Sequence, residues 1–158
     1  MKLVHERLYV GTDDECMTYK EGWAIVHACK SPCHQRAVGY RKSLPNTHPH
    51  YLVYKEGNNL YLNMIDAPGP LFMMPTFSEF LKFAKDNWDS GKILLIHCNK
   101  GESRAPSLAL LFLAKCLAKI SNDSYDIAKS EFMRLYPGYM PGAGLQTYLR
   151  LHWHEIKM

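Results

Sequence analysis

The sequence has no long hydrophobic run. One of its most apolar stretches, Leu108–Leu113, is far shorter than the roughly 20 residues that a helix needs to cross a bilayer. The first ten residues include the charged side chains Lys2, Glu6 and Arg7, so they do not resemble an apolar signal segment. We therefore expect no membrane span and a cytoplasmic location.

The chain also has no internal repeats, low-complexity tracts or Pro/Gly-rich linkers. Its 158 residues, 47% of them hydrophobic and 22% charged, predict one globular domain over residues 1–158. The net charge of +4 is mild and suits an anionic substrate. Basic residues never form a long run, and their cluster between Lys30 and Lys42 fits a solvated loop best. The aromatic residues are not interleaved with regularly spaced basic residues, so nucleic acid is not an expected partner. An RNA 5′-phosphate remains a possible substrate.

Cysteines are few and irregularly spaced. The five are Cys16, Cys29, Cys33, Cys98 and Cys116. An odd count suits a reducing compartment. Cys29 and Cys33, with His27 and His34, could suggest zinc, but the chain has no Cys-x2-Cys pair and no second paired cluster. We therefore expect no metal and no cofactor.

The most informative segment that is present runs from Ile93 to Arg104. The apolar residues Ile93–Ile96 predict a strand that leads to Cys98. Five residues then separate Cys98 from Arg104. A thiolate at the mouth of such a loop can attack phosphorus while the loop amides surround the phosphate oxygens. The arginine can donate two parallel hydrogen bonds to the phosphate. The helix that begins at the arginine points the positive end of its dipole at the same anion.

The loop residues are candidates for binding phosphate. We predict this role for Asn99, Lys100, Gly101, Glu102, Ser103 and Arg104. Gly101 supplies backbone freedom in the middle of the loop, and Ala105-Pro106 suits the start of a helix. The plainer interpretation is a buried cysteine at a strand end, with Arg104 paired to a surface carboxylate.

The segment His-Cys-Asn-Lys-Gly-Glu-Ser-Arg resembles the signature loop of the cysteine-based protein phosphatases, and especially of small atypical dual-specificity phosphatases. The resemblance covers about Leu60 to Trp153. It implies that Asp66, which precedes Cys98 by 32 residues (98 − 66), is the general acid. The alternative for Asp66 is a residue that caps a turn, and Asp86 and Asp89 are weaker candidates for the acid.

The resemblance implies a metal-independent enzyme with Cys98 as nucleophile and a phosphocysteine intermediate. The expected substrates are phosphotyrosine and phosphoserine or phosphothreonine on proteins. The chain departs from the family at Ala105, where the family has Ser or Thr, so Ser103 or Ser107 would have to substitute. With the acidic Glu102, this leaves a phosphate-binding module with little turnover as an alternative. An RNA or nucleotide phosphatase and a sulfurtransferase are further alternatives.

Alternating strands and helices predict an α/β fold: a central, mostly parallel sheet of four to five strands flanked by helices. The expected strands are Leu8–Gly11, Trp23–Cys29, Tyr51–Tyr54, Asn59–Ile65 and Ile93–His97. The expected helices cover 75–88, 105–120, 126–135 and 144–156. We expect His97 to order the loop by hydrogen bonding. Cys33 or Cys116 could form a protective disulfide with Cys98.

Overall fold

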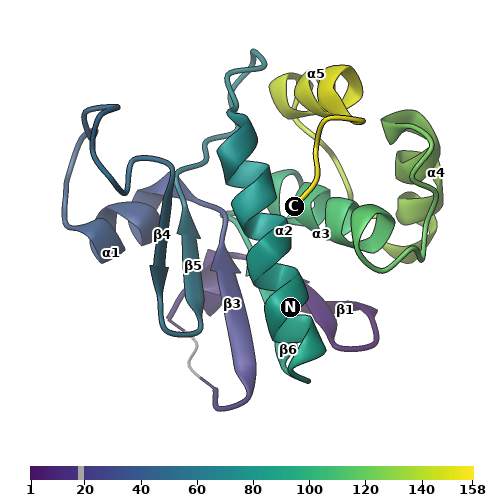
Figure 1. Cartoon of the computed structure of the whole chain (residues 1–158), viewed down its shortest axis with the longest axis horizontal. Coiled ribbons are helices and arrows are strands. Elements are labelled where there is room, and N and C mark those ends of the chain that lie inside the picture. Colours follow the sequence, from purple (N-terminus) through teal and green to yellow (C-terminus); the bar gives the residue numbers. More distant parts are fainter. Residues whose placement is uncertain (18–19) are drawn as a thin grey trace.

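The computed structural model describes residues 1–17 and 20–158 as an α/β domain built on one sheet (Figure 1). The strands are β1 (Lys2–His5), β2 (Leu8–Gly11), β3 (Trp23–His27), β4 (Val53–Glu56), β5 (Asn59–Leu62) and β6 (Ile93–His97). Their order across the sheet is β1-β2-β6-β3-β5-β4. The inner pairs β2–β6, β6–β3 and β3–β5 are parallel, and the outer pairs are antiparallel hairpins. The predicted mostly parallel α/β sheet is therefore confirmed.

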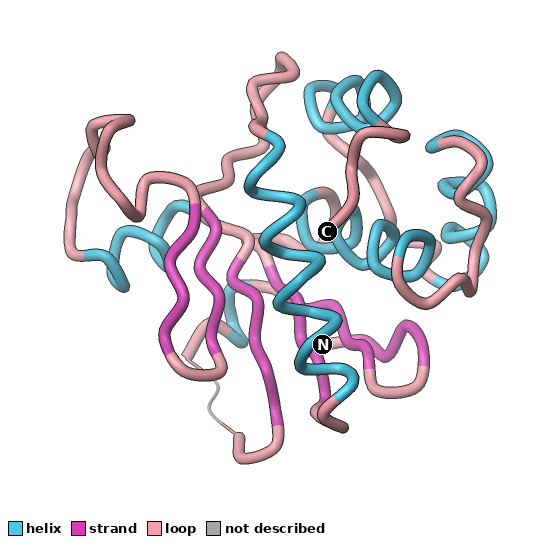
Figure 2. The backbone as a smooth tube through the Cα atoms, in the orientation of Figure 1, coloured by secondary structure: helices cyan, strands magenta, loops and turns pink. Residues whose placement is uncertain are grey.

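Five α-helices accompany the sheet in the described residues (Figure 2). They are α1 (Gln35–Val38), α2 (Met74–Asp89), α3 (Arg104–Lys115), α4 (Tyr125–Leu135) and α5 (Ala143–His152). The short turns η1 (Asp13–Glu15) and η2 (Lys30–His34) follow β2 and β3. Helices α2 and α3 pack against each other and against β6, so they cover the same face of the sheet.

The two faces of the central strand β6 have different surroundings. Leu94 and Ile96 are fully buried in the main hydrophobic core beneath α2 and α3. Strand alternation turns Leu95 and His97 to the opposite face, where they too are buried. On that second face, His27 of β3 lies directly beside His97 in the parallel register.

The structure corrects several predicted boundaries. The described sheet has six strands rather than four to five, because the short segment Lys2–His5 pairs with β2. Helix α3 ends at Lys115 rather than Ile120, since Ala118 adopts a left-handed φ of 51° that no helix accommodates. The last strand residue of β5 is Leu62, and a loop follows from there to α2.

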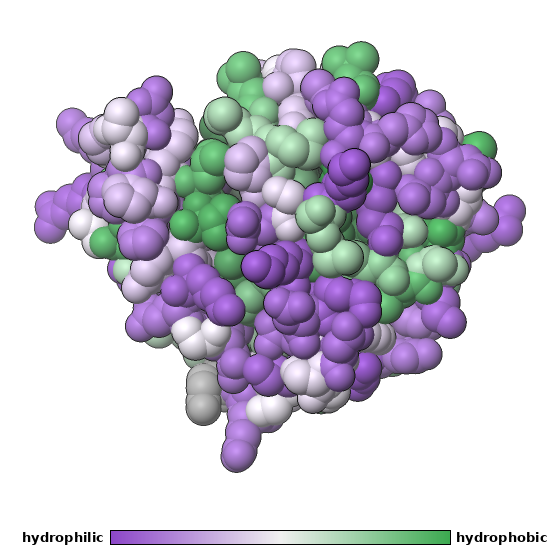
Figure 3. All heavy atoms as spheres, in the orientation of Figure 1, coloured by the Kyte–Doolittle hydropathy of each residue, from purple (hydrophilic) through white to green (hydrophobic). Residues whose placement is uncertain are grey.

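The surface over α2 is largely polar. Figure 3 shows apolar atoms between α2 and the β4–β5 hairpin, and further apolar atoms at the top and on the right side of this face. Within residues 1–17 and 20–158, no helix has both the length and the apolar character needed to traverse a membrane.

Candidate functional site

Cys98 lies at the carboxyl edge of the parallel strands. It follows the last residue of β6, and its amide donates to the carbonyl of Gly11 at the end of neighbouring β2 (3.4 Å). Its side chain is almost completely buried, with 2% exposure. Open α/β sheets bind ligands at this edge, so β6 delivers the cysteine where a ligand is expected.

The loop from Asn99 to Ser103 is an unbroken series of bends that connects β6 to α3. Gly101 has a φ of +70°, and a Cβ there would lie 3.1 Å from the Gly11 carbonyl oxygen, so only glycine fits without strain. Its own carbonyl accepts a hydrogen bond from the Tyr136 hydroxyl (2.6 Å). In the described part of the chain, the amides of residues 99–103 donate to no protein acceptor, so they are available to an anion.

Arg104 is the first residue of α3 and is held by two hydrogen bonds. One terminal nitrogen donates to the carbonyl of Met64 (2.9 Å), and the other donates to Oδ1 of Asn99 (2.7 Å). Its Nε is buried and has no partner among residues 1–17 and 20–158. A buried guanidinium N–H without an acceptor is costly, and a bound oxyanion would satisfy it.

Asp66 comes from the loop after β5 and is exposed at the same edge. Its Oδ1 accepts a hydrogen bond from the Ser103 hydroxyl (3.1 Å), which in turn accepts one from the amide of Gly142 (2.8 Å). This chain of contacts joins the loop that carries Asp66 to the loop over Asn99–Ser103 and to the segment before α5.

A cavity of about 250 Å³ unites the predicted residues. It is lined by Asp66, Cys98, Asn99, Lys100, Glu102, Ser103, Arg104 and Met140. Of the predicted set, Gly101 alone turns away from this cavity and lines its neighbour. Asp86 and Asp89 lie elsewhere, at the end of α2, where Asp89 pairs with Lys85 (2.6 Å).

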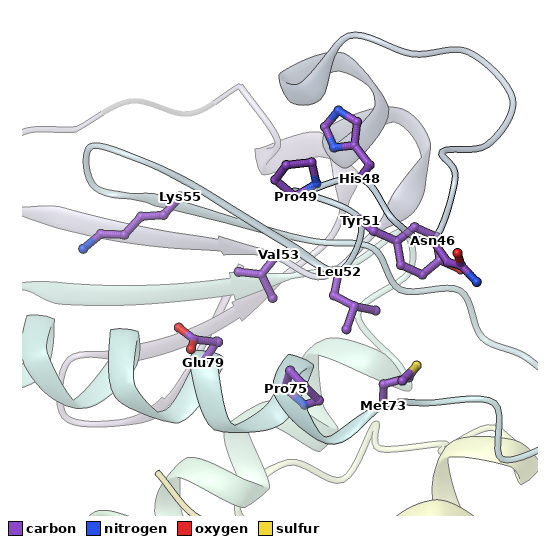
Figure 4. Close-up of a pocket in the computed structure, with 10 residues that line it drawn as sticks. All are labelled: Asn46, His48, Pro49, Tyr51, Leu52, Val53, Lys55, Met73, Pro75 and Glu79. Atoms are coloured by element: carbon purple, nitrogen blue, oxygen red, sulfur yellow. The ribbon is translucent and has the colours of Figure 1, made fainter.

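A larger pocket, of about 590 Å³, lies along β4 and the start of α2 (Figure 4). In the close-up, Leu52 and Val53 point towards the α2 side of the pocket, where Pro75 and Glu79 lie. Its lining contains neither a cysteine nor an arginine. The predicted nucleophile and anion-binding residues therefore lie together in the smaller cavity and not in this larger pocket.

The hydroxyls that could replace the one missing at position 105 are engaged elsewhere. Ser103 is bound between Asp66 and Gly142, as described above. Ser107 is fully buried, and its hydroxyl lies 2.7 Å from the Tyr139 hydroxyl, which lies 3.0 Å from that of Tyr125. Burial raises the pKa of Tyr125 to about 12, so it stays a neutral phenol in this chain of hydroxyls.

Three residues that line or support the cavity come from the segment between α4 and α5, which the sequence analysis treated only as a connection between helices. Met140 lines the cavity and donates its amide to the Glu102 carbonyl (2.7 Å), while Tyr136 and Gly142 hold the loop as described. The signal that could have indicated them is the density of glycine and proline between residues 137 and 144. Such sequences often allow close approach of one backbone to another.

The other cysteines and histidines are also placed by the structure. Cys116 follows the last residue of α3, a helix of 12 residues and so about 18 Å long, which puts it far from Cys98. Cys33 is paired with Cys16 instead. Neither predicted disulfide with Cys98 is therefore formed. Nδ1 of His97 lies 3.4 Å from the Cys98 carbonyl oxygen, a long contact in the expected place.

Comparison with protein-family models and with curated proteins finds no match for this chain. Solved structures do match. Human DUSP28 aligns over 97% of this chain and 92% of its own, with a TM-score of 0.66 and 13% identity. The human tyrosine phosphatase-like serine/threonine/tyrosine-interacting protein aligns over 97% and 95%, with a TM-score of 0.67 and 17% identity.

The Yvh1 phosphatase domain from Chaetomium thermophilum aligns over 96% of this chain and 92% of its own, with a TM-score of 0.59 and 15% identity. These neighbours confirm the predicted resemblance at the level of the fold. The chain has the fold of small dual-specificity phosphatases.

Proposed function

We propose that this protein is a cysteine-dependent phosphatase that hydrolyses phosphomonoesters, with phosphotyrosine and phosphoserine or phosphothreonine of proteins as its substrates. One observation carries the proposal: a single cavity gathers Cys98, Arg104 and Asp66 around a loop of unengaged amides. A nucleophile, an anion clamp and an acid are the three groups that phosphoryl transfer to sulfur requires.

In the first step, the Cys98 thiolate attacks phosphorus and the bond from phosphorus to the leaving oxygen breaks. Asp66 gives its proton to that oxygen, so the product leaves as an alcohol or phenol. Arg104 and the loop amides bind the three non-bridging oxygens, on which negative charge is concentrated in the transition state. The products are phosphocysteine, ionised Asp66 and the dephosphorylated substrate.

In the second step, water attacks the phosphocysteine. Asp66 takes a proton from the water, the phosphorus–sulfur bond breaks, and inorganic phosphate leaves with Cys98 restored as a thiolate. Lys100 and Glu102 are exposed at the rim of the cavity, so the site is open to a phosphorylated side chain carried by another protein. No step uses a metal ion.

The test is p-nitrophenyl phosphate hydrolysis in the presence of EDTA and a reductant, followed from the pre-steady-state phase onward. Steady metal-independent turnover is expected. Absence of both turnover and a burst, with vanadate or phosphate still bound, would contradict the proposal and favour a phosphate-binding module.

The binding module is a second candidate because of Ala105. Its side chain is a buried methyl group, and the hydroxyls of Ser103 and Ser107 have other partners. One structural neighbour is itself named phosphatase-like rather than phosphatase. A burst of one product per site without further turnover would show that Cys98 reacts but that the phosphoenzyme stalls.

Ala105→Ser should accelerate phosphoenzyme hydrolysis by roughly tenfold, because a hydroxyl at this position can stabilise the departing thiolate. The measurement is the ratio of the burst rate to the steady-state rate. Ala109→Ser adds the same hydroxyl one turn further along α3, where the helix backbone can accept its hydrogen bond, and should leave the ratio unchanged. An unaltered ratio in both variants would mean that position 105 does not limit the second step.

Gly142→Ala should lower turnover roughly 10²-fold, since small misplacements of a catalytic group have effects of this size. A Cβ at Gly142 would overlap Oδ1 of Asp66 and lie only 2.8 Å from its Cγ, so the carboxylate must move. The backbone at Gly142 (φ −64°, ψ 151°) suits any residue. The contact of the new Cβ with the Asp66 carboxylate would therefore cause the loss of turnover.

Gly138→Ala is the matched control for this experiment. A Cβ at Gly138 would have its nearest neighbour, Cε1 of Tyr136, at an ordinary 3.7 Å. Steady-state kinetics and the melting temperature of both variants should be compared. Equal activity in the two would show that Asp66 does not need its present position.

A further inference from the structure

Two cysteines and two histidines converge on the face of the sheet that lies opposite α2 and α3. The ligand atoms of Cys16, His27, Cys33 and His97 all lie within 4.8 Å of one another. His27, Cys33 and His97 are buried, with exposures of 2% or less, and Cys16 is partly buried. The Cys98 cavity contains none of the four residues.

The topology creates this cluster. His27 and His97 end the adjacent parallel strands β3 and β6 and lie opposite each other in the register, so their rings project from the same face. Cys16 follows η1, which continues from β2, and Cys33 lies in η2, which continues from β3. Three neighbouring strands therefore send their carboxyl ends, or the turns after them, to one point.

A short hydrogen bond joins the two rings. Nε2 of His27 lies 2.9 Å from Oδ1 of Asn59, a carbonyl oxygen that can only accept, so this nitrogen carries the proton and Nδ1 is free to accept or to ligate. That Nδ1 is 2.7 Å from Nε2 of His97, which can donate to it. Nδ1 of His97 lies 3.4 Å from the Cys98 carbonyl oxygen, a weaker contact.

Without a metal, the proton on Nε2 of His97 lies between the two rings. A metal ion would replace that proton and take both nitrogens as ligands, and their separation would widen from 2.7 Å to the roughly 3.3 Å of tetrahedral zinc. The outer nitrogens would then face the Asn59 oxygen and the Cys98 carbonyl. A metal-bound histidine usually donates its second nitrogen to a carbonyl or carboxylate in this manner.

We propose that Cys16, His27, Cys33 and His97 form a Cys2His2 site for a divalent, thiol-seeking metal ion, zinc in the first instance. Tetrahedral zinc with bonds of about 2.3 Å to sulfur and about 2.0 Å to nitrogen separates a sulfur from a nitrogen ligand by about 3.6 Å. The separation from Sγ of Cys33 to Nε2 of His97 is 3.8 Å. With four protein ligands the site is closed, so the metal is structural rather than catalytic.

The competing state of the same residues is a disulfide. The structure pairs Cys16 with Cys33, and their Cα atoms are 6.9 Å apart, at the outer limit of the separations usual for a disulfide. A disulfide would use both sulfurs and leave the two imidazoles hydrogen-bonded only to each other and to their outer partners. The metal site accounts for all four side chains.

This set differs from the one that the sequence suggested and then disfavoured. Cys29 takes no part, and His34 is occupied by the Tyr40 hydroxyl (2.6 Å) and the His50 carbonyl (2.9 Å). A metal bound here would fix His97, the residue before Cys98, and would tie the base of the phosphate loop to β2 and β3. The proposal is independent of phosphatase activity.

The experiment uses the full chain, purified with a phosphine reductant, freed of metal with a chelator, and given one equivalent of Zn²⁺ or Co²⁺ before desalting. Elemental analysis should find one metal ion per chain. The cobalt protein should show a thiolate-to-metal charge-transfer band and the strong visible bands of tetrahedral cobalt. Cys16→Ser should lose the charge-transfer intensity and most of the bound metal, and since Cys16 is only partly buried this variant is expected to fold.

Asn59→Leu provides a second variant that keeps all four ligands. Loss of the hydrogen bond to His27 should weaken metal affinity about 10- to 100-fold. Cys98→Ser and Cys116→Ser are controls that should retain one metal ion per chain. Metal-free wild-type protein, a Cys16–Cys33 disulfide that persists in the reductant, or metal that is lost in Cys98→Ser would each overturn the proposal.

Discussion

Replacing Cys98 with serine should lower turnover of phosphomonoesters by roughly 10³-fold or more, while phosphate or tungstate still binds. A hydroxyl is a far weaker nucleophile than a thiol because it ionises much less readily. The oxyanion-binding groups remain, because Arg104 is held by Met64 and Asn99 and not by the cysteine. Steady-state kinetics and isothermal titration with tungstate measure the two properties separately.

Cys116→Ser is the matched control, since this free and partly buried cysteine lies beyond the far end of α3. It should retain turnover and phosphate affinity. Loss of phosphate affinity together with turnover in Cys98→Ser would indicate a collapsed loop, and circular dichroism with a melting curve would detect it. Full activity in Cys98→Ser would refute the phosphocysteine mechanism.

The sequence predicted the strand, loop and helix around Cys98 and Arg104 well because this arrangement is local. Cys98 and Arg104 are separated by a few residues, and the strand before them and the helix after them have strong apolar patterns. Once Ile93–His97 forms a buried strand and α3 begins at Arg104, the short connection must pass between them. Asp66 could be identified only through a family resemblance. The structure brings it to the same cavity from the loop after β5.

The contacts across the sheet could not be predicted in this way. His27 and His97 are 70 residues apart, and their proximity depends on the parallel register of β3 and β6. A shift of that register by one residue would send one ring to the other face. The sequence shows that both strands end in histidine, but not that the strands are neighbours.

The first turn of α5 illustrates a second limit. Gly144 is buried, and a Cβ there would overlap the carbonyl oxygens of Ala67 and Gly69, so the loop that carries Asp66 rests directly on this glycine. Close packing of a loop against the first turn of a helix leaves no periodic pattern in the sequence. Glycine marks such places, but it does not identify the partner segment.

Asp66→Asn should reduce turnover strongly on substrates with poor leaving groups, by roughly 10²-fold or more on phenyl phosphate. It should reduce turnover much less on p-nitrophenyl phosphate, whose leaving oxygen needs little help from an acid. The amide keeps the shape of the side chain and can still accept the Ser103 hydroxyl at 3.1 Å, so the loop contact is preserved. The measurement is the dependence of kcat/KM on leaving group for wild type and variant.

Asp89→Asn supplies the control, because this carboxylate is paired with Lys85 at the end of α2 and lies outside the cavity. It should leave both rates unchanged. An equal loss on both substrates in Asp66→Asn would mean that Asp66 positions the loop through Ser103 rather than donating a proton. Because a general acid works only while it is protonated, loss of the alkaline limb of the pH–rate profile together with the steeper leaving-group dependence would identify Asp66 as the acid, since positioning alone changes neither.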